Sequence, residues 1–171
     1  IDWTGQDNGW GRGLPPAEHN FESWIIQADL LARDELRPTA HDIAAAQAQA
    51  LDLLRLRRST PLFSLGSAEL VRERVSFPVC GPQAQPGVIV MVIDDGAGEA
   101  DVDPALDGVV VVLNATPHEI GQRVDALVGR FLVLSDVQAH GSDPVVRETR
   151  FDAATGKVTV PARTVAVLVE P

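Results

Sequence analysis

Two valine-rich runs constrain the fold of this chain more than any other feature, VIVMVI at residues 88–93 and VVVVL at residues 109–113. Valine and isoleucine branch at Cβ, which restricts their rotamers in a helix and suits them to the pleated surface of a sheet. Their unbroken apolar character indicates strands that are covered on both faces or central in a sheet. A membrane-spanning helix needs roughly 20 apolar residues, so neither run predicts one.

Five further segments after residue 60 have the length and composition of short strands bounded by turn residues. They are residues 71–77, 131–134, 145–151, 157–160 and 164–169. VRERVSF at 71–77 carries charge on alternate positions and is typical of an exposed strand. Helical patterns are absent between these segments, apart from a short turn at 123–128. The sequence therefore predicts a mainly β fold, an antiparallel sandwich of two stacked sheets over residues 61–171.

A helix is predicted before the sandwich, over residues 39–58. Thr39 can cap its amino end, and Asp42 three residues later favours the same end through the helix dipole. Arginines follow at the other end, and Pro61 closes the segment. One narrow apolar face recurs at helical spacing and predicts packing against another part of the molecule. That face comprises Ile43, Ala46, Ala50, Leu53 and Leu54.

The opening segment QDNGWGRGLPP, residues 6–16, is predicted to be a shaped loop. Glycine supplies backbone angles that other residues avoid, and proline fixes its own, so neither a helix nor a strand suits it. Two interpretations stay open on the residues alone. The loop lines a site, or it is a surface connection whose Trp10 packs on its own domain.

Composition excludes several classes of partner. The chain has 14 basic and 24 acidic residues among 171, for a formal charge of −10. Such a charge repels phosphate backbones and anionic lipid, so neither nucleic acid nor a membrane is an expected partner.

Cys80 is the single cysteine, which excludes an internal disulfide and a site built on paired cysteines. Ile1 stands where a methionine would begin a complete protein, so we expect a cut or processed piece.

The residues by themselves indicate no catalytic or metal site. The four histidines are scattered, and no HxxxH pair, GxSxG elbow or nucleotide-binding glycine motif occurs. Asp94 and Asp95 could hold a cation, but a hairpin turn with Gly96 is the favoured interpretation. Asn114 fits a glycan acceptor pattern, yet it is discounted because the end of its strand looks buried. The acidic residues fall mainly in turns or on exposed faces, and none is a convincing catalyst.

Several longer motifs carry a resemblance to a known family. They are IDWTGQDNGWGRGLPP at the start, RRSTPLFSLGSAELVRERVSF, VIVMVIDDG, DGVVVVLNATP and VTVPARTVAVLVEP at the end. In this order, the chain resembles the carboxyl-terminal part of pullulanase-type debranching enzymes of the alpha-amylase superfamily, a group that includes limit dextrinases. The resemblance implies a retaining hydrolase of alpha-1,6-glucosidic branch links in pullulan, starch or limit dextrins, built on a (β/α)8 barrel.

On this resemblance, residues 1–60 are a remnant of that barrel and residues 61–171 are the carboxyl-terminal sandwich. Residues 1–37 would be the loop after the last barrel strand, and residues 39–58 the last barrel helix. Loops that follow barrel strands form the active-site face. Asp7, Asn8 and Trp10 are then candidates for substrate binding, the first two by hydrogen bonds to hydroxyls and the indole by stacking on a sugar ring.

The resemblance also implies what this chain lacks. The family's catalytic acids lie on earlier barrel strands, none of whose motifs occurs here, so the expected partners are the rest of the barrel and an alpha-glucan. Alone, the chain is expected to be inactive. Calcium is common in the superfamily, but no ligand set is identifiable, and bacterial relatives are often secreted or envelope-associated. The alternative is a non-catalytic glycan-binding or purely structural module, although residues 61–171 contain no Trp or Tyr and their few Phe occupy apparent core positions.

Overall fold

The computed structural model describes residues 17–31, 33–36, 38–98 and 100–171. The chain divides into two compact units, residues 1–50 and 51–171. The prediction of a domain boundary near residue 60 stays a prediction. In the described part of the chain, no helix combines the length and the apolar character needed to cross a membrane.

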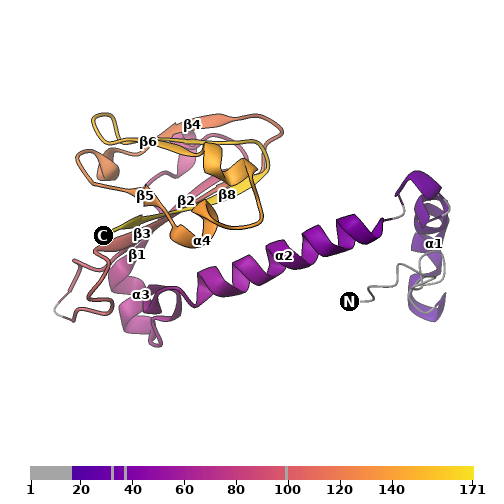
Figure 1. Cartoon of the computed structure of the whole chain (residues 1–171), viewed down its shortest axis with the longest axis horizontal. Helices are drawn as coiled ribbons and strands as arrows, with labels where there is room; N and C mark the ends of the chain where they lie inside the picture. The colour runs from indigo at the N-terminus through magenta and orange to yellow at the C-terminus, as the bar shows by residue number, and fades with distance from the viewer. Residues whose placement is uncertain (1–16, 32, 37, 99) are drawn as a thin grey trace. The chain divides into compact units, whose positions relative to one another are not determined.

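The described part of the first unit is helical. It contains α1 (Ala17–Leu31), the 3-10 turn η1 (Asp34–Leu36) and the beginning of α2 (Ala40–Arg57), as Figure 1 shows. The expectation that residues 1–37 form a loop was wrong for α1. The expectation came from the resemblance, which places this segment in the loop after the last barrel strand; in the structure it is helical, and Phe21, Ile25 and Ile26 are exposed.

The predicted start of α2 is confirmed. The Thr39 hydroxyl accepts a hydrogen bond from the Asp42 amide at 3.2 Å, while the Asp42 carboxylate accepts from the Thr39 amide at 2.8 Å and hydroxyl at 2.7 Å. These bonds satisfy amide donors that a helix end leaves free, and they lower the pKa of Asp42.

The second unit contains two antiparallel sheets, which confirms the predicted sandwich (Figure 1). The larger sheet has the order β1, β2, β3, β8, β5, and the smaller has the order β4, β7, β6. The bounds are β1 Val75–Ser76, β2 Val88–Asp94, β3 Gly108–Asn114, β4 Ile120–Arg123, β5 Val133–Leu134, β6 Arg150–Asp152, β7 Lys157–Val160 and β8 Thr164–Glu170. The valine-rich runs form β2 and β3, and the segments at 157–160 and 164–169 form β7 and β8.

Two of the predicted strands are partly helical. In the segment at 71–77, the first four residues belong to helix α3 (Ala68–Arg74), and only the next two form the short β1. Ser67 caps the start of this helix, because its hydroxyl accepts a hydrogen bond from the Leu70 amide at 3.2 Å. The segment at 145–151 begins with η5 (Val145–Glu148) and only then enters β6. Strand β4 was missed, since Gly121, Gln122 and Arg123 leave Ile120 as its one large apolar residue.

Short helical turns complete the second unit. They are η2 (Pro61–Ser64), η3 (Gly81–Gln83), η4 (Asp125–Leu127) and α4 (Asp136–Ala139). Turn η4 lies within the turn predicted at 123–128. The turns predicted at 94–96 and 154–156 are also present.

The main core lies between the two sheets. Alternate residues of β2 and β3 point into it together with residues of β4, β7 and β8. Its members include Val90, Val110, Val112, Val158, Val160 and Leu168. Full burial of one such side chain contributes about 1.5–3 kcal/mol, so this core accounts for much of the stability of the unit.

The other face of the larger sheet carries a second apolar cluster. Leu56 from the end of α2 and Leu62 from η2 pack with Ile93, Val109, Val111 and Val167. Because β3 is apolar on both faces, it lies between the two clusters, as its unbroken valines predicted.

Candidate functional site

The sequence-predicted substrate-binding residues Asp7, Asn8 and Trp10 lie outside the described residues. Their role as glucan contacts therefore stays a prediction. The features below belong to the second unit, residues 51–171, which carries both sheets.

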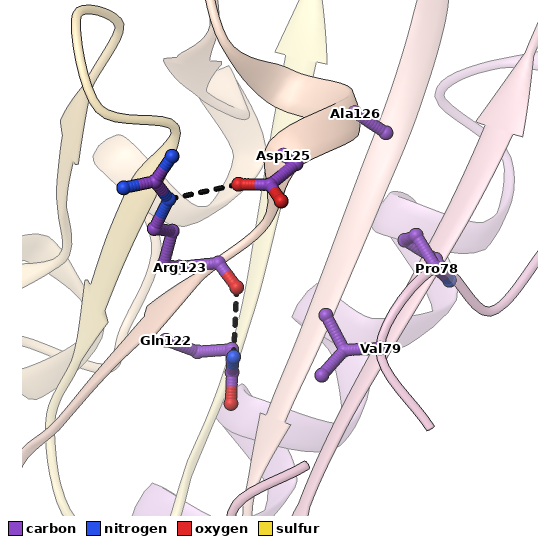
Figure 2. A pocket seen from close by; sticks show the side chains of 6 residues that line it. All are labelled: Pro78, Val79, Gln122, Arg123, Asp125 and Ala126. Carbon is purple, nitrogen blue, oxygen red and sulfur yellow. Dashed lines mark hydrogen bonds and ion pairs between the residues drawn. The ribbon is translucent and has the colours of Figure 1, made fainter. Parts of the chain in front are cut away.

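A pocket of about 340 Å³ opens where the segment after β1 faces β4 and η4 (Figure 2). It is lined by Pro78, Val79, Gln122, Arg123, Asp125 and Ala126. Sequence reasoning missed these residues because β4 itself was missed. A polar Gln-Arg pair followed closely by Asp125 is too common on protein surfaces to identify a site without the fold.

The polar groups of this pocket are suited to binding rather than to bond cleavage. Arg123 Nε donates to Asp125 Oδ1 at 2.8 Å, and Gln122 Nε2 donates to the Arg123 carbonyl at 2.7 Å (Figure 2). A glycosidase needs two carboxyl groups on either side of the scissile bond. Asp125 is the one carboxylate among the lining residues, so the pocket offers a neutral polar ligand hydrogen bonds but no acid pair.

The carboxylates of Asp94 and Asp95 are occupied by the protein itself. Asp95 is buried and pairs with the buried guanidinium of Arg74, and it also accepts from the amides of Val102 at 3.1 Å and Asp103 at 2.7 Å. Asp94 accepts from the Gly96 amide at 3.0 Å, as the predicted turn requires. A cation would have to displace these donors, so the pair is a structural feature.

The described residues contain no candidate cluster of metal-ligating side chains. Among them, no group of three or more His, Cys, Asp or Glu side chains could hold a metal ion. Calcium usually takes six to eight oxygen ligands. The resemblance makes calcium possible without identifying ligands, and that possibility stays untested.

Among the described residues, the histidines belong to no metal-ligating cluster, and the Asn114 amide is used within the fold. His19, His41, His118 and His140 are all exposed, the first two on helices. Asn114 is buried at the end of β3, and its amide donates to the carbonyls of His118 at 2.8 Å and Pro161 at 2.7 Å. These bonds explain why an asparagine occupies the strand end, and they occupy the amide nitrogen to which a glycan would be attached.

Two phenylalanines correct the expectation that the Phe of residues 61–171 occupy core positions. Phe77 is 55% exposed and Phe131 is 69% exposed. Phe77 directly follows β1 and precedes Pro78 in the pocket, whereas Phe131 precedes β5 at the opposite edge of the larger sheet. Phe77 lies just after the end of β1 and Phe131 lies before the start of β5, so neither ring belongs to a strand of the sheet.

A family model described as alpha-1,6-glucosidases, pullulanase-type, C-terminal, matches residues 5–171. The chain is 39% identical over 174 residues to Pullulanase 1, chloroplastic, of Arabidopsis thaliana, and 35% identical over 175 residues to a pullulanase of Klebsiella pneumoniae. The two alignments cover 99% and 100% of this chain, but only 18% and 16% of the relatives. The chain thus spans less than a fifth of their length.

Solved structures agree with these relatives. The crystal structure of PulA from Klebsiella oxytoca matches with a TM-score of 0.81 and 32% identity, over 100% of this chain and 16% of that one. A maltotriose complex of PulA from Klebsiella pneumoniae matches with a TM-score of 0.79 and 33% identity, over 100% of this chain and 18% of that one. With a family model that matches nearly its whole length, the chain belongs to the carboxyl-terminal family of pullulanase-type alpha-1,6-glucosidases.

Proposed function

We propose that this chain is the carboxyl-terminal part of an enzyme that hydrolyses alpha-1,6-glucosidic branch links in pullulan, starch or limit dextrins. The observation that carries the proposal is the sequence identity of 39% to the plant pullulanase, in an alignment that covers 99% of the chain. A shared fold alone would not imply a shared activity. The family match over residues 5–171 supports the proposal, because that family is itself defined among alpha-1,6-glucosidases.

The catalytic acids of this enzyme are proposed to lie outside the chain. The pocket of Figure 2 has a single lining carboxylate, that of Asp125, and this is paired with Arg123. Asp95, the buried acid beside Arg74, is held by amide donors and a guanidinium and has no access to a substrate. We propose that the described residues contribute a scaffold rather than the bond-breaking groups.

The experiment that tests the function compares the 171-residue chain with the full-length enzyme on pullulan. The full-length enzyme should release new reducing ends by cleaving alpha-1,6 links, and the chain alone should release none. A full-length enzyme that cleaves only alpha-1,4 links would contradict the proposal. Activity of the isolated chain would contradict the placement of the acids.

The opening loop is proposed to contact the glucan through Asp7, Asn8 and Trp10. Replacing Trp10 by Ala in the full-length enzyme should raise KM for a branched glucan about 2- to 10-fold, the equivalent of an aromatic stacking energy of about 0.5–1.5 kcal/mol. Trp10→Phe is the matched control, because it keeps a ring that can stack. An unchanged KM in Trp10→Ala would remove the loop from the binding role.

A second candidate function is glycan binding by the sandwich itself, and the exposed ring of Phe77 favours it. Phe77 precedes Pro78 at the pocket where Gln122 and Arg123 supply hydrogen-bonding groups. Phe131 belongs to the opposite edge of the sheet, because β1 and β5 are four strand spacings apart, about 19 Å measured across the sheet.

Affinity electrophoresis of the 171-residue chain in gels that contain starch or pullulan tests this candidate. Retardation that Phe77→Ala abolishes would support a glycan site at the pocket. Phe131→Ala is the control, since it removes an equally exposed ring from the far edge of the sheet. A chain that migrates identically with and without polysaccharide would exclude the candidate.

A further inference from the structure

Arg123 and Asp125 lie side by side on a rigid part of the second unit. Strand β4 ends at Arg123, and η4 begins at Asp125. Val124, the residue between them, is fully buried, and so is Leu127 of η4. Both of these apolar residues belong to the core between the sheets. The backbone that carries the two charged side chains is therefore held in place by the core, as a binding site requires.

The Arg123–Asp125 pair keeps hydrogen-bonding capacity for a ligand. Arg123 Nε donates to Asp125 Oδ1 at 2.8 Å (Figure 2). Within the described part of the chain, the two Nη atoms of Arg123 and the second carboxylate oxygen of Asp125 have no hydrogen-bond partner. The side chains are 68% and 84% exposed, so a ligand can reach both. Because a guanidinium only donates and a carboxylate only accepts, the pair presents a donor beside an acceptor.

The remaining side of the pocket is mainly apolar. Pro78 and Val79 come from the segment after β1, and Ala126 belongs to η4 (Figure 2). Val79 also packs against the core between the sheets, which fixes this wall. The volume of about 340 Å³ is near the lower end of the range for small-molecule sites, about 300–1,000 Å³. A sugar ring suits such a pocket, because its C–H faces can contact the apolar wall while its hydroxyls reach the charged pair.

The balance of charge in the pocket favours a neutral ligand. The carboxylate of Asp125 repels an anionic group such as a phosphate, and the guanidinium of Arg123 repels an ammonium group. A hydroxyl, by contrast, both donates and accepts. Two hydroxyls on adjacent carbons can therefore bind the pair together, one by donating to Asp125 and the other by accepting from Arg123.

We infer that the pocket binds an alpha-glucan through the adjacent C2 and C3 hydroxyls of one glucose residue, and that Arg123 and Asp125 are the residues that recognise them. The inference rests on the proposed function, which makes an alpha-glucan the substrate, and it adds the recognition residues to the second candidate function. The C2 and C3 hydroxyls stay free in both alpha-1,4- and alpha-1,6-linked glucose. The pocket therefore accepts either linkage, whereas the proposed cleavage selects alpha-1,6 links.

Hydrogen–deuterium exchange of the full-length enzyme tests the inference, because mass spectrometry locates the peptides that a ligand protects. Maltohexaose is added over a range of concentrations, and exchange of the Leu127 and Val128 amides is followed. These amides donate to the carbonyls of Val124 and Asp125 across η4. A ligand held by Asp125 should stabilise this turn and slow their exchange. The dissociation constant follows from the dependence of this protection on the maltohexaose concentration.

Arg123→Met and Asp125→Asn should each raise this dissociation constant at least about fivefold, because each removes a charged hydrogen-bonding partner. Arg150→Met is the matched control. Arg150 of β6 pairs in the same way with Glu119, at 3.0 Å, and is 64% exposed, but it does not line the pocket. This control should bind maltohexaose as the wild type does. Unchanged binding in both Arg123→Met and Asp125→Asn would overturn the inference.

A second ligand tests the recognition of adjacent hydroxyls. Periodate cleaves the bond between C2 and C3 of maltohexaose, and reduction with borohydride then leaves two hydroxyls that are no longer adjacent. Equal protection by this product and by intact maltohexaose would overturn the inference. Protection confined to the preceding part of the enzyme would overturn it and leave the proposed function standing. Cleavage of pullulan by the same preparations reports that function separately.

Discussion

The buried pair of Arg74 and Asp95 offers the sharpest test of how the second unit is held together. Arg74 is fully buried at the end of α3, and its guanidinium donates to the Asp95 carboxylate, the Asp95 carbonyl and the Ala100 carbonyl. Asp103 extends the network, because its amide donates to Asp95 and its carboxylate accepts from Thr60 at 2.5 Å. The network thus fastens the loop after β2 to α3 and to the segment after α2.

Replacing Arg74 by Met keeps most of the volume but leaves the Asp95 charge buried without a cation. Removal of one partner from a buried ion pair costs about 3–5 kcal/mol. A unit of about 120 residues has a free energy of unfolding of about 6–18 kcal/mol, so the loss is a large fraction of it. For a domain of this size, such a loss lowers Tm by about 10–20 °C.

Urea denaturation of the 171-residue chain, followed by circular dichroism, measures this loss. Arg72→Met is the matched control on the same helix, because the Arg72 side chain is 75% exposed and lies 3.8 Å from Glu69. It should change the free energy of unfolding by less than about 0.5 kcal/mol. Adding Asp95→Asn to Arg74→Met should recover part of the loss by removing the buried charge. A loss below about 1 kcal/mol for Arg74→Met would refute the reasoning.

Asp52 predicts a dependence of stability on pH. Its carboxylate accepts from the Ser142 amide at 2.7 Å, which lowers its pKa below 3.8. The stabilisation by this bond is therefore complete above the unfolded pKa of Asp52 and is lost as pH falls through the folded pKa. Urea titrations should show that Asp52→Asn is less stable than wild type near neutral pH. The free energies of unfolding of the two proteins should converge in acid. Gly156 has φ of 66°, where a Cβ would clash with the Val124 carbonyl, whereas Gly129 has φ of 82° and open space. In the same assay, Gly156→Ala should lower the free energy of unfolding more than Gly129→Ala, for which backbone strain alone is about 1–2 kcal/mol. Equal decreases for the two variants would contradict the predicted clash.

Local pattern was sufficient for the central strands and for one helix end. The valines of β2 and β3 predict buried strands because Cβ branching and unbroken apolar character act within a few residues. Thr39 and Asp42 predict the start of α2 for the same reason, since a cap is completed within one turn. The long motifs also carried enough similarity to indicate the family, which the family model confirms.

The local sequence pattern did not predict the structure where the same residues are compatible with either a helix or a strand. VRERVSF alternates like an exposed strand, yet its first four residues belong to α3, which begins at the Ser67 cap and ends at Arg74. Phe77 was expected in the core, but β1 ends one residue before it, at the edge of the sheet. The pocket with Gln122 and Asp125 could not be anticipated, because the segment before η3 reaches β4 only in the folded unit.

The sequence by itself determined which segments become central strands, how α2 begins and to which family the chain belongs. Those properties depend on the stiffness, polarity and spacing of residues that are close neighbours along the chain. Only the tertiary structure decided that Arg74 meets Asp95, and that Ile89 and Val165 of the larger sheet are about half exposed. Both features depend on residues far apart along the chain, so strand order and register determine them.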